Sequence, residues 1–205
     1  MKITVVGGTG LVGQGILKEL SKQKNFELHS LSRTGKRPNS IENVTYHSVD
    51  LFTDSNWIEL VQSSDWLIDC VGILFENKAK NITYYNNSVL PAQKLIDTVV
   101  NTQTNFLFIS ANHAPFFLKN YLVAKKEVED YGKKQLSTRF FCVFPGLVYS
   151  KQRLSNYYPA IILATLLKFT PFSFLAKYRP IARNTFAKEI LAIIQGKPSA
   201  LLNRI

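Results

Sequence analysis

Short, nearly continuous apolar runs alternate along the chain with longer segments in which apolar residues recur at helical spacing. The runs predict strands at about 2–7, 26–32, 44–49, 66–72, 105–110 and 139–145. The spaced pattern predicts helices at about 11–23, 55–63, 83–101, 118–135, 156–169 and 184–195. This alternation is typical of βαβ units, and continuous apolar strands are typical of a sheet that is covered on both faces. The pattern therefore predicts an α/β fold with a doubly wound parallel sheet.

The length and composition indicate an ordinary globular protein. The chain has 205 residues, of which 46% are hydrophobic and 19% charged, enough for one domain with a small appendage. We divide it into a main domain, 1–150, and a short helical segment, 151–205, that completes the fold. Cys70 and Cys142 lie within apolar runs and are expected to be buried thiols, with no metal site or disulfide framework. Met1 and Lys2 run directly into the first strand, so no targeting signal is expected and the default compartment is the cytoplasm.

The net charge of +11 is concentrated near the end of the chain. Residues 1–150 carry 16 Lys/Arg and 13 Asp/Glu, a net of +3, whereas residues 151–205 carry 9 Lys/Arg and one acid, a net of +8. Such a segment can be a solvated basic surface, or it can meet a phosphorylated ligand, an anionic membrane or nucleic acid. No nucleic-acid-binding motif accompanies it, so that partner is disfavoured.

A glycine-rich loop follows the first strand and opens an amphipathic helix. Gly7, Gly10 and Gly13 stand at GxxGxxG spacing, with Thr9, Leu11 and Val12 between them. Glycine allows the tight turn, the close approach of a pyrophosphate and the close packing of the helix on the sheet. The free N–H groups of that helix would then face the phosphates. This context predicts dinucleotide binding.

The end of the second strand bears on which dinucleotide binds. NAD-binding folds usually carry an acid there that holds the ribose 2′-hydroxyl, but this chain has Ser32 and Arg33. A guanidinium pairs with a 2′-phosphate, which an acid would repel. The sequence therefore favours NADP(H) over NAD(H), although a basic surface loop would look the same.

Tyr121 and Lys125 form a Tyr-x-x-x-Lys pair on the helix after the fifth strand. Residues four apart lie on one face of a helix, and an ammonium beside a phenol favours the phenolate. We therefore expect Lys125 to lower the pKa of Tyr121, which would let Tyr121 exchange a proton near neutral pH.

The glycine loop and this pair resemble the short-chain dehydrogenase/reductase superfamily, and the Gly-Gly-Thr-Gly form resembles its extended and atypical branches. These include NAD-dependent epimerase/dehydratase-like proteins and the branch similar to the complex I accessory subunit and to quinone-biosynthesis-associated proteins. The resemblance implies a Rossmann fold in which Lys125 also holds the nicotinamide ribose. It implies that further cofactor contacts come from Asp50, Leu51, Val71, Gly72, Asn87, Pro145, Gly146 and Val148.

The serine of the family's catalytic triad has no clear counterpart. Ser110 ends the fifth strand but lies only 11 residues before Tyr121, about half the usual separation in the family. It can orient a substrate carbonyl or merely close the strand end, and Asn112 or His113 can take its place.

The last quarter of the chain is apolar and basic. We expect a helical lid over the substrate pocket, with peripheral membrane contact through 157–183 and oligomer contact as the alternatives. Pro159, Lys168 and Pro171 divide the apolar run, so a membrane-spanning helix is not expected.

Two functions remain open at this point. One is an NADPH-dependent oxidoreductase that acts on a carbonyl or alcohol of an unidentified small molecule, with Tyr121, Lys125 and Ser110 as catalytic residues. The other is a non-catalytic NADP(H)-binding sensor or assembly factor.

Overall fold

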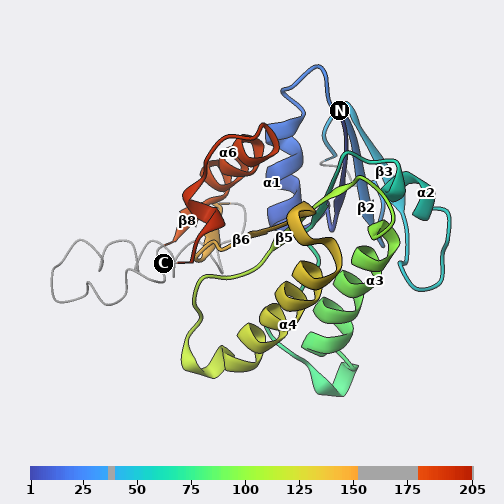
Figure 1. Cartoon of the computed structure of the whole chain (residues 1–205). Coiled ribbons are helices and arrows are strands. Elements are labelled where there is room, and N and C mark those ends of the chain that lie inside the picture. The colour runs from blue at the N-terminus through green and yellow to red at the C-terminus, as the bar shows by residue number, and fades with distance from the viewer. Residues whose placement is uncertain (37–39, 152–179, 205) are drawn as a thin grey trace, which may run out of the picture.

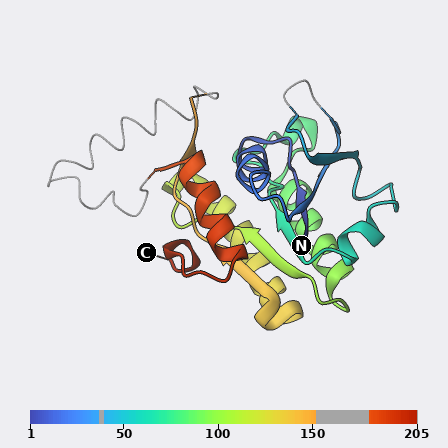
Figure 2. The same ribbon diagram turned by 90° about the horizontal axis from the view of Figure 1, so that it is seen from above.

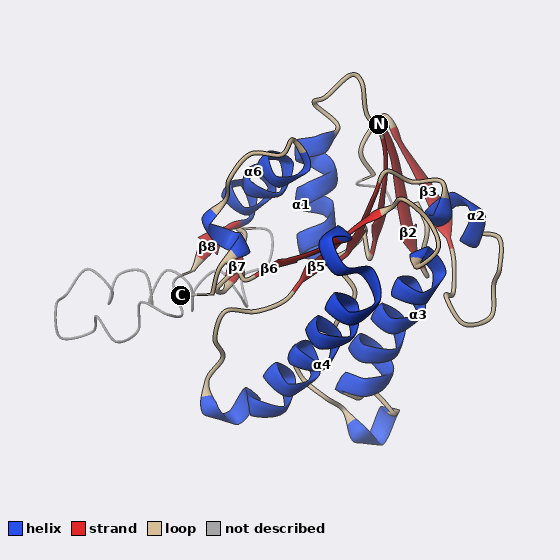
Figure 3. Ribbon diagram, in the orientation of Figure 1, coloured by secondary structure: helices blue, strands red, loops and turns tan. Residues whose placement is uncertain are grey.

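The computed structural model describes residues 1–36, 40–151 and 180–204. Six parallel strands form the main sheet in the order β3-β2-β1-β4-β5-β6 (Figure 3). Their bounds are β1 Lys2–Val6, β2 Glu27–Ser32, β3 Val44–Ser48, β4 Trp66–Asp69, β5 Asn105–Ile109 and β6 Phe140–Val143. A second small sheet pairs β7 (Val148–Tyr149) with β8 (Ile181–Ala182). The predicted doubly wound parallel sheet is confirmed.

Helices cover both faces of the sheet. The main ones are α1 Leu11–Leu20, α2 Ile58–Gln62, α3 Leu90–Val99, α4 Lys119–Leu136 and α6 Arg183–Ile194. Shorter helical turns are η1 Lys78–Lys80, η2 Tyr85–Val89, η3 Phe116–Leu118, η4 Ser137–Arg139 and η6 Ala200–Leu202. Helices α1 and α6 pack side by side on one face, and α3 and α4 pack together on the other (Figures 1 and 2). The helix expected at 156–169 lies outside the described residues, as does most of the expected lid and of the expected membrane contact at 157–183.

Each face of the sheet has its own apolar core. Strand side chains alternate between the two faces, so Val6, Leu67 and Phe108 meet α2, α3 and α4. Val5 and Ile68 meet α1 and α6. Because the strands are buried on both sides, they lack the apolar-polar alternation of a half-exposed sheet. No helix of the described part is long and apolar enough to cross a membrane.

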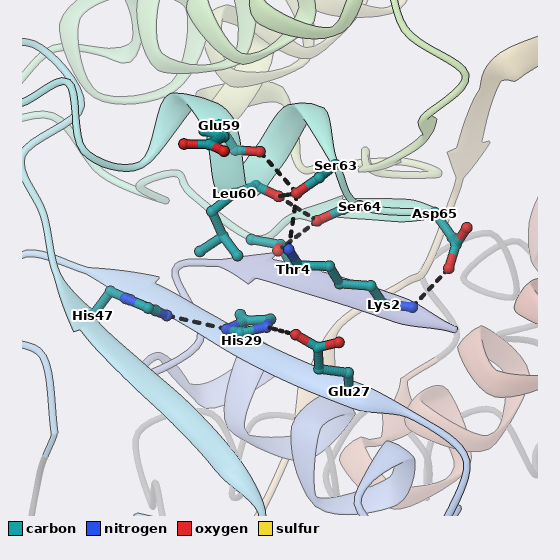
Figure 4. Close-up of polar contacts among 10 residues, drawn as sticks. All are labelled: Lys2, Thr4, Glu27, His29, His47, Glu59, Leu60, Ser63, Ser64 and Asp65. Carbon is teal, nitrogen blue, oxygen red and sulfur yellow. Dashed lines mark hydrogen bonds and ion pairs between the residues drawn. The ribbon is translucent and has the colours of Figure 1, made fainter.

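Two sets of polar contacts cross the strands near β1 (Figure 4). In the first, the Thr4 hydroxyl hydrogen-bonds to Ser64 at 2.8 Å, and the backbone N–H of Lys2 donates to Asp65 at 2.7 Å. These contacts fix the turn between α2 and β4 against β1.

The second set is a chain of three side chains on β2 and β3 (Figure 4). His29 Nε2 lies 2.8 Å from Glu27 Oε1, and His29 Nδ1 lies 3.1 Å from His47 Nε2. With His29 donating to Glu27, the two rings satisfy each other when His47 Nε2–H donates to His29. Burial, assisted by electrostatic effects of His29 and Lys2, lowers the pKa of His47.

His47→Gln should make stability less dependent on pH. Because the folded pKa of His47 is below its unfolded value of 6.5, its neutral form stabilises the fold above that pH, and this contribution is lost as the pH falls below it. The variant should therefore lose about 0.5 kcal/mol less free energy of unfolding between pH 7.5 and 5, a small difference because the ring is partly exposed. Urea unfolding at the two pH values measures it, and equal losses would contradict the prediction.

Candidate functional site at the carboxyl edge of the sheet

The glycine loop joins β1 to α1 by a backbone path that side chains would block. Gly7 has a φ of +78°, and its N–H donates to Leu31 O at 2.8 Å. A Cβ on Gly13 would lie 2.5 Å from Gly7 O, and one on Gly8 would lie 2.3 Å from Ser30 Oγ. Helix α1 therefore starts directly against the end of β1, as the motif predicts.

The first turn of α1 is open to an anion. Its N-cap residue is Gly10, and neither a side-chain cap nor an acid occupies the first turn. The amides of Leu11, Val12 and Gly13 consequently have no partner within the helix, and the positive end of the helix dipole is not offset locally. This arrangement suits a phosphate group.

The end of β2 carries the residues predicted to select the nucleotide. Arg33 is exposed, and its carbonyl oxygen accepts a hydrogen bond from Ser48 Oγ at 3.1 Å, so its backbone is fixed beside β3. Ser30 Oγ and Ser32 Oγ are buried and have no hydrogen-bond partner among the residues that the structure describes. Buried hydroxyls normally have partners, so these two atoms fit a site that a polar ligand completes.

Asp50 and Asn87 have local partners in this structure. Asp50 Oδ1 accepts from the N–H of Phe52 at 2.9 Å, and Asn87 Oδ1 accepts from the N–H of Thr83 at 3.1 Å. These are the capping contacts that short polar side chains commonly make. Leu51 packs against the core beside α2 and α3. The roles that the family resemblance implies for these three residues stay predictions.

Two further predicted segments lie at the ends of β4 and β6. The N–H of Val71 donates to Asp69 Oδ1 at 2.8 Å, and Gly72 leads into a backbone whose Ile73 N–H donates to Ser88 Oγ at 3.3 Å. After β6, Pro145 O accepts from the N–H of Asn112 at 3.1 Å. Gly146 and Val148 then lead into the small sheet with β8. Parallel strands present all these segments at one edge.

Helix α4 brings Tyr121 and Lys125 together on the face that it turns to the sheet. Lys125 is 6% exposed, and its Nζ donates to Ile109 O at 2.7 Å. Nζ also lies 4.5 Å from the ring centroid of Phe108 and 5.7 Å from that of Tyr121. The Tyr121 ring packs against Tyr84 with centroids 5.9 Å apart. The predicted pairing of Tyr121 with Lys125 at the strand ends is therefore present.

The expected lowering of the Tyr121 pKa is wrong for this arrangement. Burial, with a smaller effect from Tyr84, raises the pKa of Tyr121 to about 12. Lys125 approaches the face of the ring and donates to a backbone oxygen, so its charge does not stabilise the phenolate. Burial also lowers the pKa of Lys125, against the opposing effect of Asp69.

Ser110 is engaged by a carboxylate that the sequence reasoning missed. Its Oγ donates to Glu129 Oε1 at 2.5 Å, and Arg204 Nη2 donates to the same oxygen at 2.5 Å. Ser110 and Glu129 are each 2% exposed. Glu129 follows Lys125 by four residues, as Lys125 follows Tyr121, so all three lie on one face of the helix. This spacing is the signal in the sequence that could have pointed to Glu129.

Arg204 reaches Glu129 because residues 199–204 are held at several points. Ser199 Oγ donates to Glu189 on α6 at 2.6 Å, and Leu201 O accepts from the N–H of Phe144 at 2.8 Å. The Arg204 guanidinium lies 4.6 Å from the ring centroid of Phe144. This segment therefore supplies a cation to the buried carboxylate of Glu129 beside Ser110.

A family model identifies the family of the chain. The model of the NAD dependent epimerase/dehydratase family matches residues 3–115, more than half of the 205 residues. The chain belongs to the NAD-dependent epimerase/dehydratase family. The match begins in β1 and includes the glycine loop and all strands through β5. The predicted resemblance to the short-chain dehydrogenase/reductase superfamily is confirmed at this level.

Several solved structures share the fold of this family member. UDP-glucuronic acid 4-epimerase from Bacillus cereus, solved with NAD, matches with a TM-score of 0.73 and 15% identity over 100% of this chain and 76% of that one. WbmF from Bordetella bronchiseptica, solved with NADH, matches at 0.66 and 16% over 96% and 69%. The oxidoreductase ylbE from Lactococcus lactis matches at 0.67 and 18% over 95% and 85%. At such identities the likeness concerns the fold.

The residues present fit the nicotinamide dinucleotide that the family name implies. The glycine loop brings the start of α1 directly against the end of β1 with no side chain between them, the first turn of α1 is uncapped, and Ser32 Oγ is a buried atom without a partner among the described residues. Among the described residues, no group of three or more His, Cys, Asp or Glu is arranged to hold a metal ion. The thiols are buried or half-buried, and burial raises the pKa of both.

Arg204→Gln should destabilise the protein through Glu129. In the variant, the buried Glu129 carboxylate loses Arg204 and keeps its hydrogen bond from Ser110. This loss should lower the free energy of unfolding by about 1–3 kcal/mol. Adding Glu129→Gln removes the buried charge and should recover part of the loss. Denaturant unfolding of the two single variants and the double variant measures the coupling. Additive effects would show that the ion pair does not act as a unit.

Proposed function

We propose that the protein binds a nicotinamide dinucleotide at the carboxyl edge of the sheet and uses it in a redox reaction of a small molecule with a carbonyl or alcohol group. The observation that carries this proposal is the Tyr121 and Lys125 pair, which lies at the ends of β4 and β5 on the same edge as the glycine loop. The bound nucleotide supplies or accepts the hydride.

In this proposal Tyr121 acts on the substrate as a proton donor. With a pKa of about 12, its hydroxyl is protonated at neutral pH and can give a proton to the oxygen of a carbonyl that is being reduced. Lys125 is held at Ile109 O and has two further N–H groups for the nucleotide ribose. The reverse reaction requires the ligands to lower the pKa of Tyr121, since the phenol alone is a poor base.

NADP(H) is the proposed nucleotide. Arg33 is exposed at the end of β2, where no acid stands to repel a 2′-phosphate. The relatives solved with NAD or NADH make NAD(H) the alternative. The nucleotide in those structures belongs to those proteins, so selectivity has to be measured on this chain.

The second candidate is a non-catalytic dinucleotide-binding sensor or assembly factor. It is favoured by the engagement of Ser110, whose one hydroxyl proton is donated to Glu129 and is therefore not available to a substrate carbonyl. Ser110 retains lone pairs, so it can accept a hydrogen bond from a ligand while Glu129 is ionised.

Arg33→Ala should weaken NADPH binding selectively. Loss of the charge-assisted contact to the 2′-phosphate should cost about 1.5–3 kcal/mol, roughly 10- to 100-fold in Kd, with NADH affinity nearly unchanged. Parallel fluorescence titrations with NADPH and NADH measure both affinities, and Lys22→Ala is an exposed control elsewhere on the surface. Equal weakening for both nucleotides would argue against the assignment, and no binding of either by the wild type would reject the proposed function.

Tyr121→Phe separates the enzyme from the sensor. The variant keeps the ring contact with Tyr84 but loses the proton donor, so turnover should fall by about 10²- to 10⁴-fold while nucleotide affinity changes little. A panel of carbonyl and alcohol substrates, followed by NADPH absorbance, provides the assay. A wild type that binds NADPH and turns over nothing on the panel would favour the sensor.

A further inference from the structure

Asp69 is an acid placed where the core is otherwise apolar. It is the last residue of β4 and is 1% exposed. In the sheet it is paired with Val6 of β1 on one side and with Phe108 of β5 on the other. Its Oδ1 accepts from the N–H of Val71 at 2.8 Å, but its Oδ2 is buried without a hydrogen-bond partner in the described part of the chain.

Lys125 comes to the same place from helix α4. Its Nζ lies 4.5 Å from the ring centroid of Phe108, the residue paired with Asp69 in the sheet. A Cβ on Gly72, three residues after Asp69, would lie 3.7 Å from Nζ. The ammonium therefore sits between the ends of β4 and β5, on the face of the sheet that Asp69 shares with Phe108.

Of the groups that act on Lys125, Asp69 is the acid that has no cation of its own among the contacts described here. Those that act on the ammonium are Asp69, Glu129 and the thiols of Cys70 and Cys142, and the Tyr121 ring lies beside it. Burial raises the pKa of both thiols, and Tyr121 is a phenol at neutral pH, so these groups are uncharged. Glu129 is shared between Ser110 and Arg204.

A buried carboxylate of this kind costs stability. Burial raises the pKa of Asp69 to about 6, and both the N–H of Val71 and the charge of Lys125 oppose that rise. An apolar residue would spare the protein the desolvation of a charge. Such costly groups cluster at functional sites, and this one lies beside the pair that carries the proposed chemistry.

We propose that Asp69 is a positioning residue for Lys125: the two side chains make no direct hydrogen bond or ion pair, and the buried carboxylate attracts the nearby ammonium and favours its position toward the nucleotide ribose. This inference rests on the proposed function, because it assigns Lys125 to the ribose. Below about pH 6 Asp69 takes up a proton and loses its charge, so the attraction on Lys125 weakens as the pH falls through that value.

The coupling can be tested in the protein without nucleotide. Carboxyl ¹³C NMR, with Asp69 assigned by comparison with Asp69→Asn, should give a midpoint near 6 for this group. Lys125→Met should move the midpoint upward, because the ammonium favours the carboxylate, and Lys125→Arg should restore it. A midpoint that is the same with Met as with Lys at position 125 would overturn the proposal.

The consequence for binding is tested by titrating the whole chain with NADPH between pH 5 and 8. The 2′-phosphate of NADPH also ionises in this range, so the comparison is between variants: Asp69→Asn should match the wild type near pH 5, and wild-type affinity should exceed it by about three- to tenfold once Asp69 is ionised. Asp130→Asn, on the exposed side of α4, is the matched control and should keep the wild-type profile. A wild-type profile in Asp69→Asn would overturn the inference. If the wild type binds neither NADPH nor NADH at any pH, the proposed function fails, whereas the NMR result still decides the coupling between Asp69 and Lys125.

Discussion

The structure depends on the contact between the glycine loop and the first helix. The backbones of Gly7, Gly8 and Gly13 meet at distances that exclude a Cβ, so α1 lies directly on the sheet. Gly15 on the same helix lets the side chain of Arg183 pass, since a Cβ there would lie 2.5 Å from Arg183 Cγ. Close packing of α1 thus positions α6 as well, and it orients the amides of α1 at the edge where every strand ends. One steric constraint links the fold of this face to the phosphate site.

Much of the fold could be predicted because its signals are local. Strand and helix positions follow from apolar periodicity, which single segments carry without reference to their neighbours. The helix expected at 83–101 illustrates the limit of such signals, because it begins with the π-helical turn η2 before α3. The hydrogen bond between Thr83 N–H and Asn87 Oδ1 and the packing of Tyr84 on Tyr121 accompany that turn. The contact between Tyr84 and Tyr121 joins distant parts of the chain, and periodicity does not report it.

The candidate site could be predicted only in part, for the same reason. The glycine loop and the Tyr-x-x-x-Lys pair are compact motifs, and both lie at the carboxyl edge of the sheet. Glu129 and Asp69 were missed because each acquires its meaning from a partner far away in sequence. Glu129 looks like an ordinary acid on a charged helix until Arg204 reaches it, 75 residues later. Asp69 is a lone acid in an apolar run. Burial of such an acid has a desolvation cost, but the sequence does not show which cation lies near it.

The wrong expectation for Tyr121 shows how burial and charge compete in this site. Spacing on a helix places an ammonium near a phenol, but it does not fix whether that ammonium meets the hydroxyl or the ring. Here Ile109 O holds Nζ at 2.7 Å, Phe108 and Tyr121 present ring faces to it, and desolvation outweighs any attraction to a phenolate. Desolvation disfavours the charged forms of Asp69, Tyr121 and Lys125 at this edge. A ligand that enters the site displaces water and adds its own hydroxyl groups. The pKa of Tyr121 in the complex therefore depends on the ligand as well as on the protein. Asp69 and Glu129 both act electrostatically on the Lys125 ammonium, so these two acids help to keep positive charge in the site.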